Sequence, residues 1–155
     1  MTITLRPVAE SDRDFLMALY ASTREEELRA VPWSAEERAA FLRQQFDAQD
    51  VHYREHYPGA TLDVVCDDGE PIGRFYVYRT ASEVRLMDIG LVPAACGRGI
   101  GSRLLEDLLA EAGRVGKKVT LHVLPWSRSM GLYQRLGFRG VEQRGAYLFM
   151  ERPAP

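Results

Sequence analysis

The chain has 155 residues, of which 46% are hydrophobic and 27% are charged, and its formal net charge is -2. A chain of this length buries enough surface to fold without disulfides or a bound metal, so we expect a single domain over residues 1–155. The near-neutral charge argues against nucleic acid as a partner, because phosphate binding needs a clear basic excess. No stretch approaches the roughly 18 apolar residues that span a membrane, and the N-terminus lacks the apolar core of a signal peptide. With two isolated cysteines, Cys66 and Cys96, these features indicate a cytoplasmic protein with no membrane partner.

The first third of the chain predicts a strand followed by two helices. Alternating apolar residues indicate a strand over residues 2–6. Ser11 with Asp14 resembles a capping box, which predicts a helix that begins there. Ser34 with Glu37 repeats that pattern. The second helix is expected to run to residue 57, because Pro58-Gly59 is the first firm stop.

The rest of the chain alternates strands with helices. We expect a hairpin over residues 62–66 and 72–78, a strand over 84–92, a helix over 100–115, a strand over 119–124, a short helix over 127–136, and strands over 138–142 and 147–152. This order predicts an α/β (α+β) fold, a mixed and mostly antiparallel sheet of six to seven strands with helices on both faces. The strand after the long helix should run parallel to the strand before it.

A glycine-rich turn joins the strand over 84–92 to the following helix. Gly97, Gly99 and Gly101 permit positive φ and let backbone N–H groups approach a ligand. The helix N-terminus adds unpaired donors and a partial positive charge, and Arg98 adds a charge-assisted contact. Together they predict an anion site suited to a pyrophosphate.

Several cofactors use such turns, and the residues discriminate between them. The dinucleotide-binding pattern needs Gly or Ala where this chain has Ser102, and the Gly-Lys-Ser/Thr of a Walker A loop is absent. A glycine-rich turn that binds nothing is the remaining alternative on this segment alone.

The run over residues 89–105 resembles the acetyl-CoA signature of the GNAT superfamily of N-acyltransferases, Gln/Arg-x-x-Gly-x-Gly/Ala. Gly99 and Gly101 match that signature, whereas Cys96 stands where Gln or Arg is expected. A second segment, Leu121 to Phe138, resembles the family's Leu-x-Val, Asn and Leu-Tyr-x-x-x-Gly-Phe pattern. Ser127 stands at the Asn position and departs from it. Serine still suits a helix cap.

The resemblance implies a splay between the fourth and fifth strands, in which the pantetheine arm of acetyl-CoA lies. It implies a cofactor site made by Leu91, Val92, Gly97, Arg98, Gly99, Ile100, Gly101, Ser102, Ser127 and Tyr133. A main-chain N–H would polarise the thioester carbonyl. The acceptor amine attacks directly, and no metal takes part.

Two proton transfers then remain, one from the incoming ammonium and one to the departing thiolate, and bulk water or another residue is an alternative to a side-chain base named below. The resemblance implies that Tyr133 acts as general acid at the sulfur, and its alternative role is packing within a helix. Asp88 and His122 are the candidates for the general base, since both fall on strands beside the expected thioester. Asp88 has the alternative of pairing with an arginine such as Arg85, and His122 that of a structural histidine.

The acceptor pocket is expected at the first two helices, as in the family. Trp33, Tyr53 and Tyr57 are the candidate substrate-binding residues, with core packing as their alternative. His52 and His56 have the spacing of metal ligands on a helix, but no third ligand is evident nearby, so we predict no metal.

These observations predict an acyl-CoA-dependent N-acetyltransferase. The acceptor is a primary amine of a small molecule, an amino-acid derivative or a peptide. The alternative is a catalytically weak acyl-CoA-binding sensor or interaction module, which the departures at Cys96 and Ser127 favour. The resemblance also allows a homodimer, because relatives often dimerise through edge strands or helices.

Overall fold

The computed structural model describes all residues from 1 to 155. Its elements, in chain order, are β1 (Ile3–Pro7), η1 (Glu10–Asp12), α1 (Arg13–Arg29), α2 (Ala35–His56), β2 (Thr61–Asp67), β3 (Glu70–Arg79), β4 (Glu83–Leu91), η2 (Pro93–Ala95), α3 (Ile100–Arg114), β5 (Lys118–Val123), α4 (Met130–Arg135), β6 (Arg139–Arg144) and β7 (Tyr147–Arg152). The seven strands are ordered β1-β2-β3-β4-β5-β7-β6 in one mixed sheet. The predicted fold class is confirmed.

The chain divides into two compact units. The first comprises Met1–Phe75 and Ile89–Cys96, and the second comprises Tyr76–Asp88 and Gly97–Pro155. Both β3 and β4 therefore begin in one unit and end in the other. The two units are described separately below.

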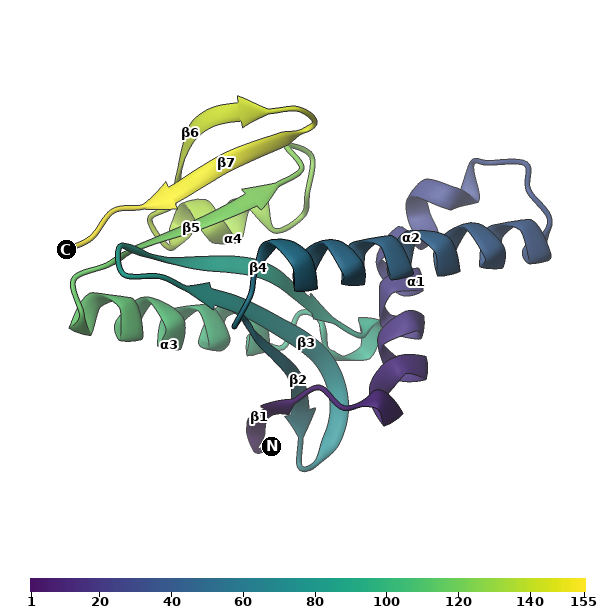
Figure 1. Ribbon diagram of the computed structural model, residues 1–155, viewed down its shortest axis with the longest axis horizontal. Coiled ribbons are helices and arrows are strands. Elements are labelled where there is room, and N and C mark those ends of the chain that lie inside the picture. The colour runs from purple at the N-terminus through teal and green to yellow at the C-terminus, as the bar shows by residue number, and fades with distance from the viewer. The chain divides into compact units, whose positions relative to one another are not determined.

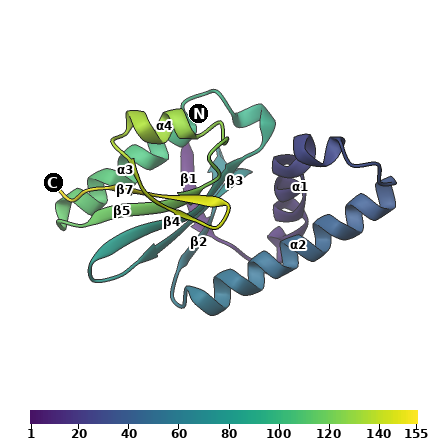
Figure 2. The same cartoon turned by 90° about the horizontal axis from the view of Figure 1, so that it is seen from above.

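In the first unit, α1 and α2 cross one another, as both views show (Figures 1 and 2). Their contact is a buried cluster of Leu16, Tyr20 and Phe46, in which the two aromatic rings lie 5.8 Å apart. Burying each such side chain contributes about 1.5–3 kcal/mol, so this cluster is what holds the two helices together. β1 pairs antiparallel with β2 beside them.

The start of α2 agrees with the predicted capping box, whereas the start of α1 does not. Ser34 Oγ accepts from the N–H of Glu37 at 3.1 Å, and the Glu37 carboxylate accepts from the N–H of Ser34 at 3.2 Å. At α1 the predicted box of Ser11 and Asp14 is wrong, because Ser11 lies inside η1.

The carboxylate that organises the start of α1 is instead that of Asp12. It accepts the N–H of Ala9 at 2.8 Å and two bonds from the Arg6 guanidinium, both at 2.8 Å. Arg6, and after it the Ala9 N–H, lower the pKa of Asp12 to about 2. Arg6 on β1 therefore determines which carboxylate bonds the backbone before α1. Local sequence spacing could not show this, because Arg6 lies outside the capping pattern.

The second unit contains a parallel strand pair. β4 pairs with β5 over Glu83–Leu86 and Lys118–Leu121, as predicted for the strands on either side of the long helix. β5 and β7 run side by side and antiparallel (Figures 1 and 2). The helix α3 buries one apolar stripe, made by Ile100, Leu104, Leu105, Leu108 and Ala112.

The short helix α4 begins three residues later than expected, at Met130 instead of Ser127. Ser127 Oγ accepts from the N–H of Ser129 at 3.2 Å, and the Ser127 carbonyl accepts from the N–H of Met130 at 3.1 Å. Ser127 therefore forms a turn that precedes the helix, because its hydroxyl competes for the backbone N–H groups.

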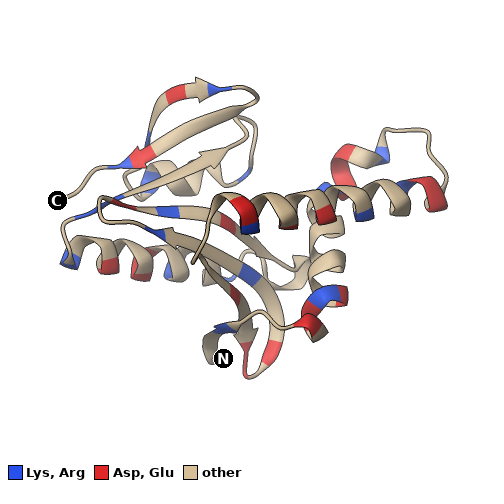
Figure 3. Cartoon of the chain, viewed as in Figure 1, with Lys and Arg blue, Asp and Glu red and all other residues tan.

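Charge is mixed along the helices. Both α2 and α3 carry acidic and basic residues, and on α3 the acidic residues Glu106, Asp107 and Glu111 lie between Arg103 and Arg114 (Figure 3). None of the helices is both long enough and apolar enough to cross a bilayer.

Candidate functional site

The predicted anion site is the turn that leads into α3. After η2 the chain passes through Gly97, with φ +75°, and Gly99, with φ +78°. Gly99 is the residue that precedes the first residue of α3, and its backbone is left-handed. A Cβ built on either glycine would meet nothing within 4 Å. Glycine is therefore needed at both positions because the backbone is left-handed there, and no atom fills the space that a Cβ would occupy.

The N-terminal amides of α3 point out of the helix at this turn. The first bond of the helix runs from the N–H of Arg103 to the carbonyl of Gly99, at 3.1 Å. The N–H groups of Ile100, Gly101 and Ser102 precede that bond, so they have no acceptor within the helix. Three convergent donors and the positive end of the helix dipole form the site to which a pyrophosphate would bind.

The end of β4, in the first unit, offers fewer free backbone groups than expected. The N–H of Val92 donates to the carbonyl of Ile72 at 2.8 Å, and the Val92 carbonyl accepts from Ala95 at 2.9 Å. Groups on consecutive strand residues point in opposite directions, so the N–H of Leu91 points away from β3. Leu91 is therefore better placed than Val92 to pair with an extended ligand.

Cys96, which stands where Gln or Arg is expected, is an exposed free thiol. Its Sγ lies 3.5 Å from the carbonyl oxygen of Val92 and 3.7 Å from that of Leu91. The side chain folds back on the strand end and contributes no positive charge to the turn. The anion site at this turn consequently depends on backbone amides.

β4 and β5 stop pairing before either strand ends. Their ladder ends at Leu86 and Leu121, while β4 continues to Leu91 and β5 to Val123. Backbone groups beyond that point are left for another partner, because a strand without a neighbour exposes its N–H and C=O groups. The feature agrees with the splay expected between the fourth and fifth strands.

Tyr133 on α4 is the most strongly perturbed titratable group of the second unit. Its side chain is buried, with 6% exposure, and its ring packs edge-on against Phe138 at 5.8 Å. Burial raises the pKa of Tyr133 to about 12, the negative charge of Asp88 adds to the rise, and a hydrogen bond from Ser129 opposes it. The phenol is therefore protonated throughout the neutral range.

Asp88 and His122 lie on opposite faces of the sheet. Side chains alternate along a strand, so Asp88 shares the face of Leu86, which is buried, and His122 shares that of Thr120. The two base candidates are thus separated by the sheet. The charge of Asp88 contributes to the raised pKa of Tyr133, after burial.

His122 belongs to a cluster of charged and aromatic side chains. Its ring lies 5.1 Å from that of Phe149, and its Nε2 lies 3.3 Å from Nη1 of Arg144. Partial burial, followed by the positive charges of Arg85 and Arg144, lowers the pKa of His122. The imidazole is therefore neutral at pH 7.

The sequence did not reveal most of this cluster. Arg85 donates to Thr120 Oγ1 at 2.7 Å, and the Thr120 hydroxyl donates to Glu83 at 2.5 Å. The guanidiniums of Arg85 and Arg144 lie 5.4 Å and 3.8 Å from the centre of the Phe149 ring. The alternation of side chains along paired strands could have placed residues 83, 85, 120 and 122 on one face of the sheet. Pairing β5 with β7 across an intervening helix and strand was needed to add the others.

The three aromatic acceptor candidates, all in the first unit, do not form one group. Tyr53 and Tyr57 lie together at the C-terminal end of α2, with ring centres 6.3 Å apart. His52 and His56 stack beside them at 4.3 Å. Trp33 packs on Phe41 at the other end of α2, roughly 30 Å away by helix rise. One small amine cannot contact both ends.

A mixed sheet that contains a parallel pair, with a glycine turn that leads from β4 into a helix with open amides, defines an α/β protein with a candidate anion site. The model of the Acetyltransferase (GNAT) family matches residues 16–138 of the chain. The match spans most of the sequence, and the chain belongs to the GNAT acetyltransferase family.

Solved structures agree with this assignment. The PaiA N-acetyltransferase from Thermoplasma acidophilum, in complex with coenzyme A, has a TM-score of 0.74 and 18% identity over 99% of both chains. An acetyltransferase from Thermus thermophilus has a TM-score of 0.70 and 22% identity over 99% of this chain and 97% of its own. At these identities the similarity shows the fold.

Proposed function

We propose that the chain transfers an acetyl group from acetyl-CoA to a primary amine of a small molecule, an amino-acid derivative or a peptide. The observation that carries the proposal is the left-handed turn at Gly97 and Gly99, which leaves the first amides of α3 open in the same unit as the buried Tyr133. Membership of the GNAT family and the coenzyme A in the Thermoplasma acidophilum structure support an acyl-CoA donor.

The donor's pyrophosphate binds at the turn. The N–H groups of Ile100, Gly101 and Ser102 donate to its oxygens, and Gly97 and Gly99 supply the left-handed backbone that directs those amides outward. Arg98 adds a charged contact, and Ser127 lies in the turn before α4. The pantetheine arm pairs with the backbone of Leu91 where β4 has parted from β5.

The reaction is a direct attack. The neutral amine nitrogen forms a bond to the thioester carbonyl carbon and an oxyanion develops. The C–S bond then breaks to release CoA thiolate, and the nitrogen loses its extra proton, which balances the proton that the thiolate takes up to become CoA thiol. Tyr133 donates its proton, or a hydrogen bond, to that sulfur. A phenol of pKa about 12 and the thiol of released CoA, of pKa about 8.5, differ by about 3.5 units, so complete proton transfer to the free thiolate would cost about 5 kcal/mol. Tyr133 therefore acts through a hydrogen bond that stabilises the thiolate while the C–S bond breaks.

The acceptor's ammonium must lose a proton before it attacks. Asp88 and His122 are the two side chains proposed to take it, and they differ in what surrounds them. Asp88 contributes to the raised pKa of Tyr133, whereas the pKa of His122 is lowered and its Nε2 lies 3.3 Å from Nη1 of Arg144. The effect of pH on activity separates them, as argued in the Discussion.

Thiol release from acetyl-CoA, measured across a panel of amines, tests the proposal. Release that depends on an added amine and yields the acetylated amine by mass spectrometry is the expected result. If CoA binds but no amine stimulates release, the chain is an acyl-CoA-binding module. Cys96 and Ser127, which depart from the family's signatures, favour that alternative. If CoA does not bind, both functions are excluded.

A further inference from the structure

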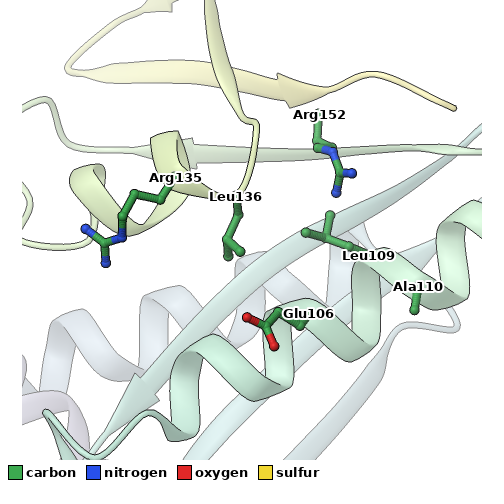
Figure 4. A pocket seen from close by; sticks show the side chains of 6 residues that line it. All are labelled: Glu106, Leu109, Ala110, Arg135, Leu136 and Arg152. Atoms are coloured by element: carbon green, nitrogen blue, oxygen red, sulfur yellow. The ribbon is translucent and has the colours of Figure 1, made fainter.

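A cavity of about 390 Å³ lies in the second unit, between α3, α4 and β7 (Figure 4). One of its walls is α3, the helix whose first amides form the anion site, so the cavity adjoins the donor site proposed above and is not a separate site. The first unit holds a different group of side chains, which the proposed acetyl transfer does not use. It is the pair His52 and His56 at the C-terminal end of α2.

The two imidazoles lie on one face of α2. Residues four apart in a helix are neighbours on its surface, and here the rings stack with their centres 4.3 Å apart and their planes at 27°. Both side chains are exposed. Two nitrogens on one tetrahedral zinc ion lie about 3.3 Å apart, since each Zn–N bond is about 2.0–2.1 Å long. Rotations of the exposed rings about χ2, a soft torsion, are enough to bring the two Nε2 atoms to that separation.

The hydrogen bond made by His56 leaves its outer nitrogen ready for a metal ion. Nδ1 of His56 lies 3.1 Å from the carbonyl oxygen of His52. A carbonyl oxygen only accepts, so Nδ1 carries the proton and Nε2 carries the lone pair. Histidines that bind metals usually donate the other ring N–H to a carbonyl or carboxylate in this way, which fixes the tautomer and the orientation of the ring. The spacing of the rings and this hydrogen bond are independent observations that indicate the same ligand.

The place of the pair on the helix also favours a cation. The last carbonyl groups of a helix carry a partial negative charge, and both histidines lie within residues 52–56, at the end of α2. Arg54, which lies between them in the sequence, is bonded to the carboxylate of Asp50 at 3.0 Å. The chain has no group of three or more histidine, cysteine or carboxylate side chains that could hold a metal ion. The missing third ligand led us to predict no metal, but two imidazoles suffice for a chelate when water completes the coordination.

We propose that the Nε2 atoms of His52 and His56 chelate a Zn²⁺ ion on the surface of α2. Imidazole nitrogen suits Zn²⁺, Ni²⁺ and Cu²⁺, whereas Mg²⁺ and Ca²⁺ prefer oxygen ligands. The ion links two successive turns of α2 and stabilises the helix end that carries Tyr53 and Tyr57, whose rings lie 6.2 Å and 6.3 Å from that of His52. An unfolded chain does not hold this spacing, so the ion binds the folded state more tightly.

Ring-proton NMR of the full chain tests the proposal, because the chain has three histidines and each gives its own signals. Zn²⁺, added as its chloride, should shift the ring signals of His52 and His56 and leave those of His122 in place. Mg²⁺ at the same concentration should shift none of them. The same addition of Zn²⁺ should raise the midpoint of urea unfolding in the wild type and not in His52→Gln.

Calorimetric titration with Zn²⁺ tests the chelate itself. The affinity should fall by about 10²-fold in His52→Gln and in His56→Gln, because a lone imidazole lacks the second, intramolecular contact. The matched control is Arg54→His/His56→Gln, which keeps three histidines but places two of them two residues apart, on different sides of the helix. It should bind as weakly as His56→Gln. Cys96→Ser, which removes the exposed thiol, should bind as tightly as the wild type.

Three results would overturn the inference. Ring signals of His52 and His56 that do not move with Zn²⁺ show that the pair binds no metal ion. An Arg54→His/His56→Gln variant that binds as tightly as the wild type shows that Zn²⁺ binds single surface histidines adventitiously. Affinity that is lost in Cys96→Ser assigns the ion to the thiol. None of these results bears on the donor or on acetyl transfer, because the pair belongs to neither.

Discussion

Arg144 and His122 form a contact in which the arginine occupies the nitrogen that a general base would use. Nη1 of Arg144 lies 3.3 Å from Nε2 of His122. A guanidinium can only donate, so Nε2 accepts and the imidazole carries its proton on Nδ1. The same arginine is held by Glu142 at 2.5 Å and lies over Phe149. Arg144 therefore both disfavours the protonated form of His122 and occupies its Nε2.

Removing that arginine should raise the pKa of His122. Partial burial lowers that pKa most, and the positive charges of Arg85 and then Arg144 lower it further. In Arg144→Gln the second of these charges is gone, so the pKa should move up toward its ordinary value of about 6.5. The chain has three histidines, and NMR titration of their ring protons with His122→Gln as the reference spectrum gives the shift. Arg114→Gln, which loses an equal charge at the end of α3, should leave His122 unchanged.

The same variant distinguishes the two candidate bases. If His122 accepts the ammonium proton, the acid limb of the kcat/KM profile follows its pKa and moves to higher pH in Arg144→Gln. If Asp88 accepts it, that limb stays in place and Asp88→Asn lowers kcat/KM by about 10²-fold or more. A limb that moves while Asp88→Asn keeps full activity assigns the base to His122.

Tyr133→Phe should lower turnover by about 10²-fold and change CoA affinity by less than about twofold. The loss follows because the phenol proton no longer reaches the departing sulfur. The ring still packs on Phe138, so the fold should persist. Tyr147→Phe is the control, since Tyr147 is 48% exposed and loses the same hydroxyl. Steady-state kinetics and CoA titration provide both measurements, and unchanged turnover in Tyr133→Phe would remove its proposed role.

The pKa of Tyr133 itself has a predicted dependence on Asp88. Because the carboxylate adds to the rise that burial causes, Asp88→Asn should bring the pKa of Tyr133 below its value of about 12. The difference in tyrosinate absorbance between Asp88→Asn and Asp88→Asn/Tyr133→Phe reports that titration. A pKa that does not move would show that the two side chains are not in electrostatic contact.

Gly99→Glu should abolish CoA binding, and Gly116→Glu should not. Both glycines are left-handed, at φ +78° and +66°, and neither has an atom within 4 Å of an added Cβ. The backbone strain is therefore similar, on the order of 1–2 kcal/mol. Only Gly99 stands beside the open amides at the start of α3, where a carboxylate would repel a pyrophosphate. Retained CoA affinity in a folded Gly99→Glu variant would contradict the anion site.

Sequence periodicity predicted most of the second half of the fold. β7 spans residues 147–152 as expected, and α3 ends one residue before the predicted limit of 115. These elements are specified locally, by the apolar stripe of α3 and by glycines with positive φ at 116 and 137. Both turns need glycine on backbone grounds alone, so their position could be read from the sequence.

Features that depend on a distant partner could not be predicted. α1 has no side-chain cap, and the carboxylate of Asp12 instead bonds the Ala9 N–H in the turn before it because Arg6 on β1 holds it there. The sequence likewise named His122, but it gave no sign of Arg144, which reaches that ring only through the pairing of β5, β7 and β6. Local capping rules and strand alternation describe neighbours along the chain and not those across a sheet.

Gly73 shows how closely β3 and β4 approach just before the turn, and its substitution is the sharpest test of that region. A Cβ on Gly73 would lie 2.3 Å from the carbonyl oxygen of Gly90 and 2.7 Å from Leu91 Cδ2. The oxygen is backbone, so Gly73→Ala must displace the end of β4. We expect a loss of about 1–3 kcal/mol in the free energy of unfolding, measured in urea, and weaker CoA binding because Leu91 moves with the strand.

Gly113→Ala is the matched control, since its Cβ would meet only Pro155 at 3.9 Å. Inside α3 that alanine should raise stability by up to about 1 kcal/mol. Equal stability of the two variants would mean that the close approach of β3 to Gly90 does not exist in solution.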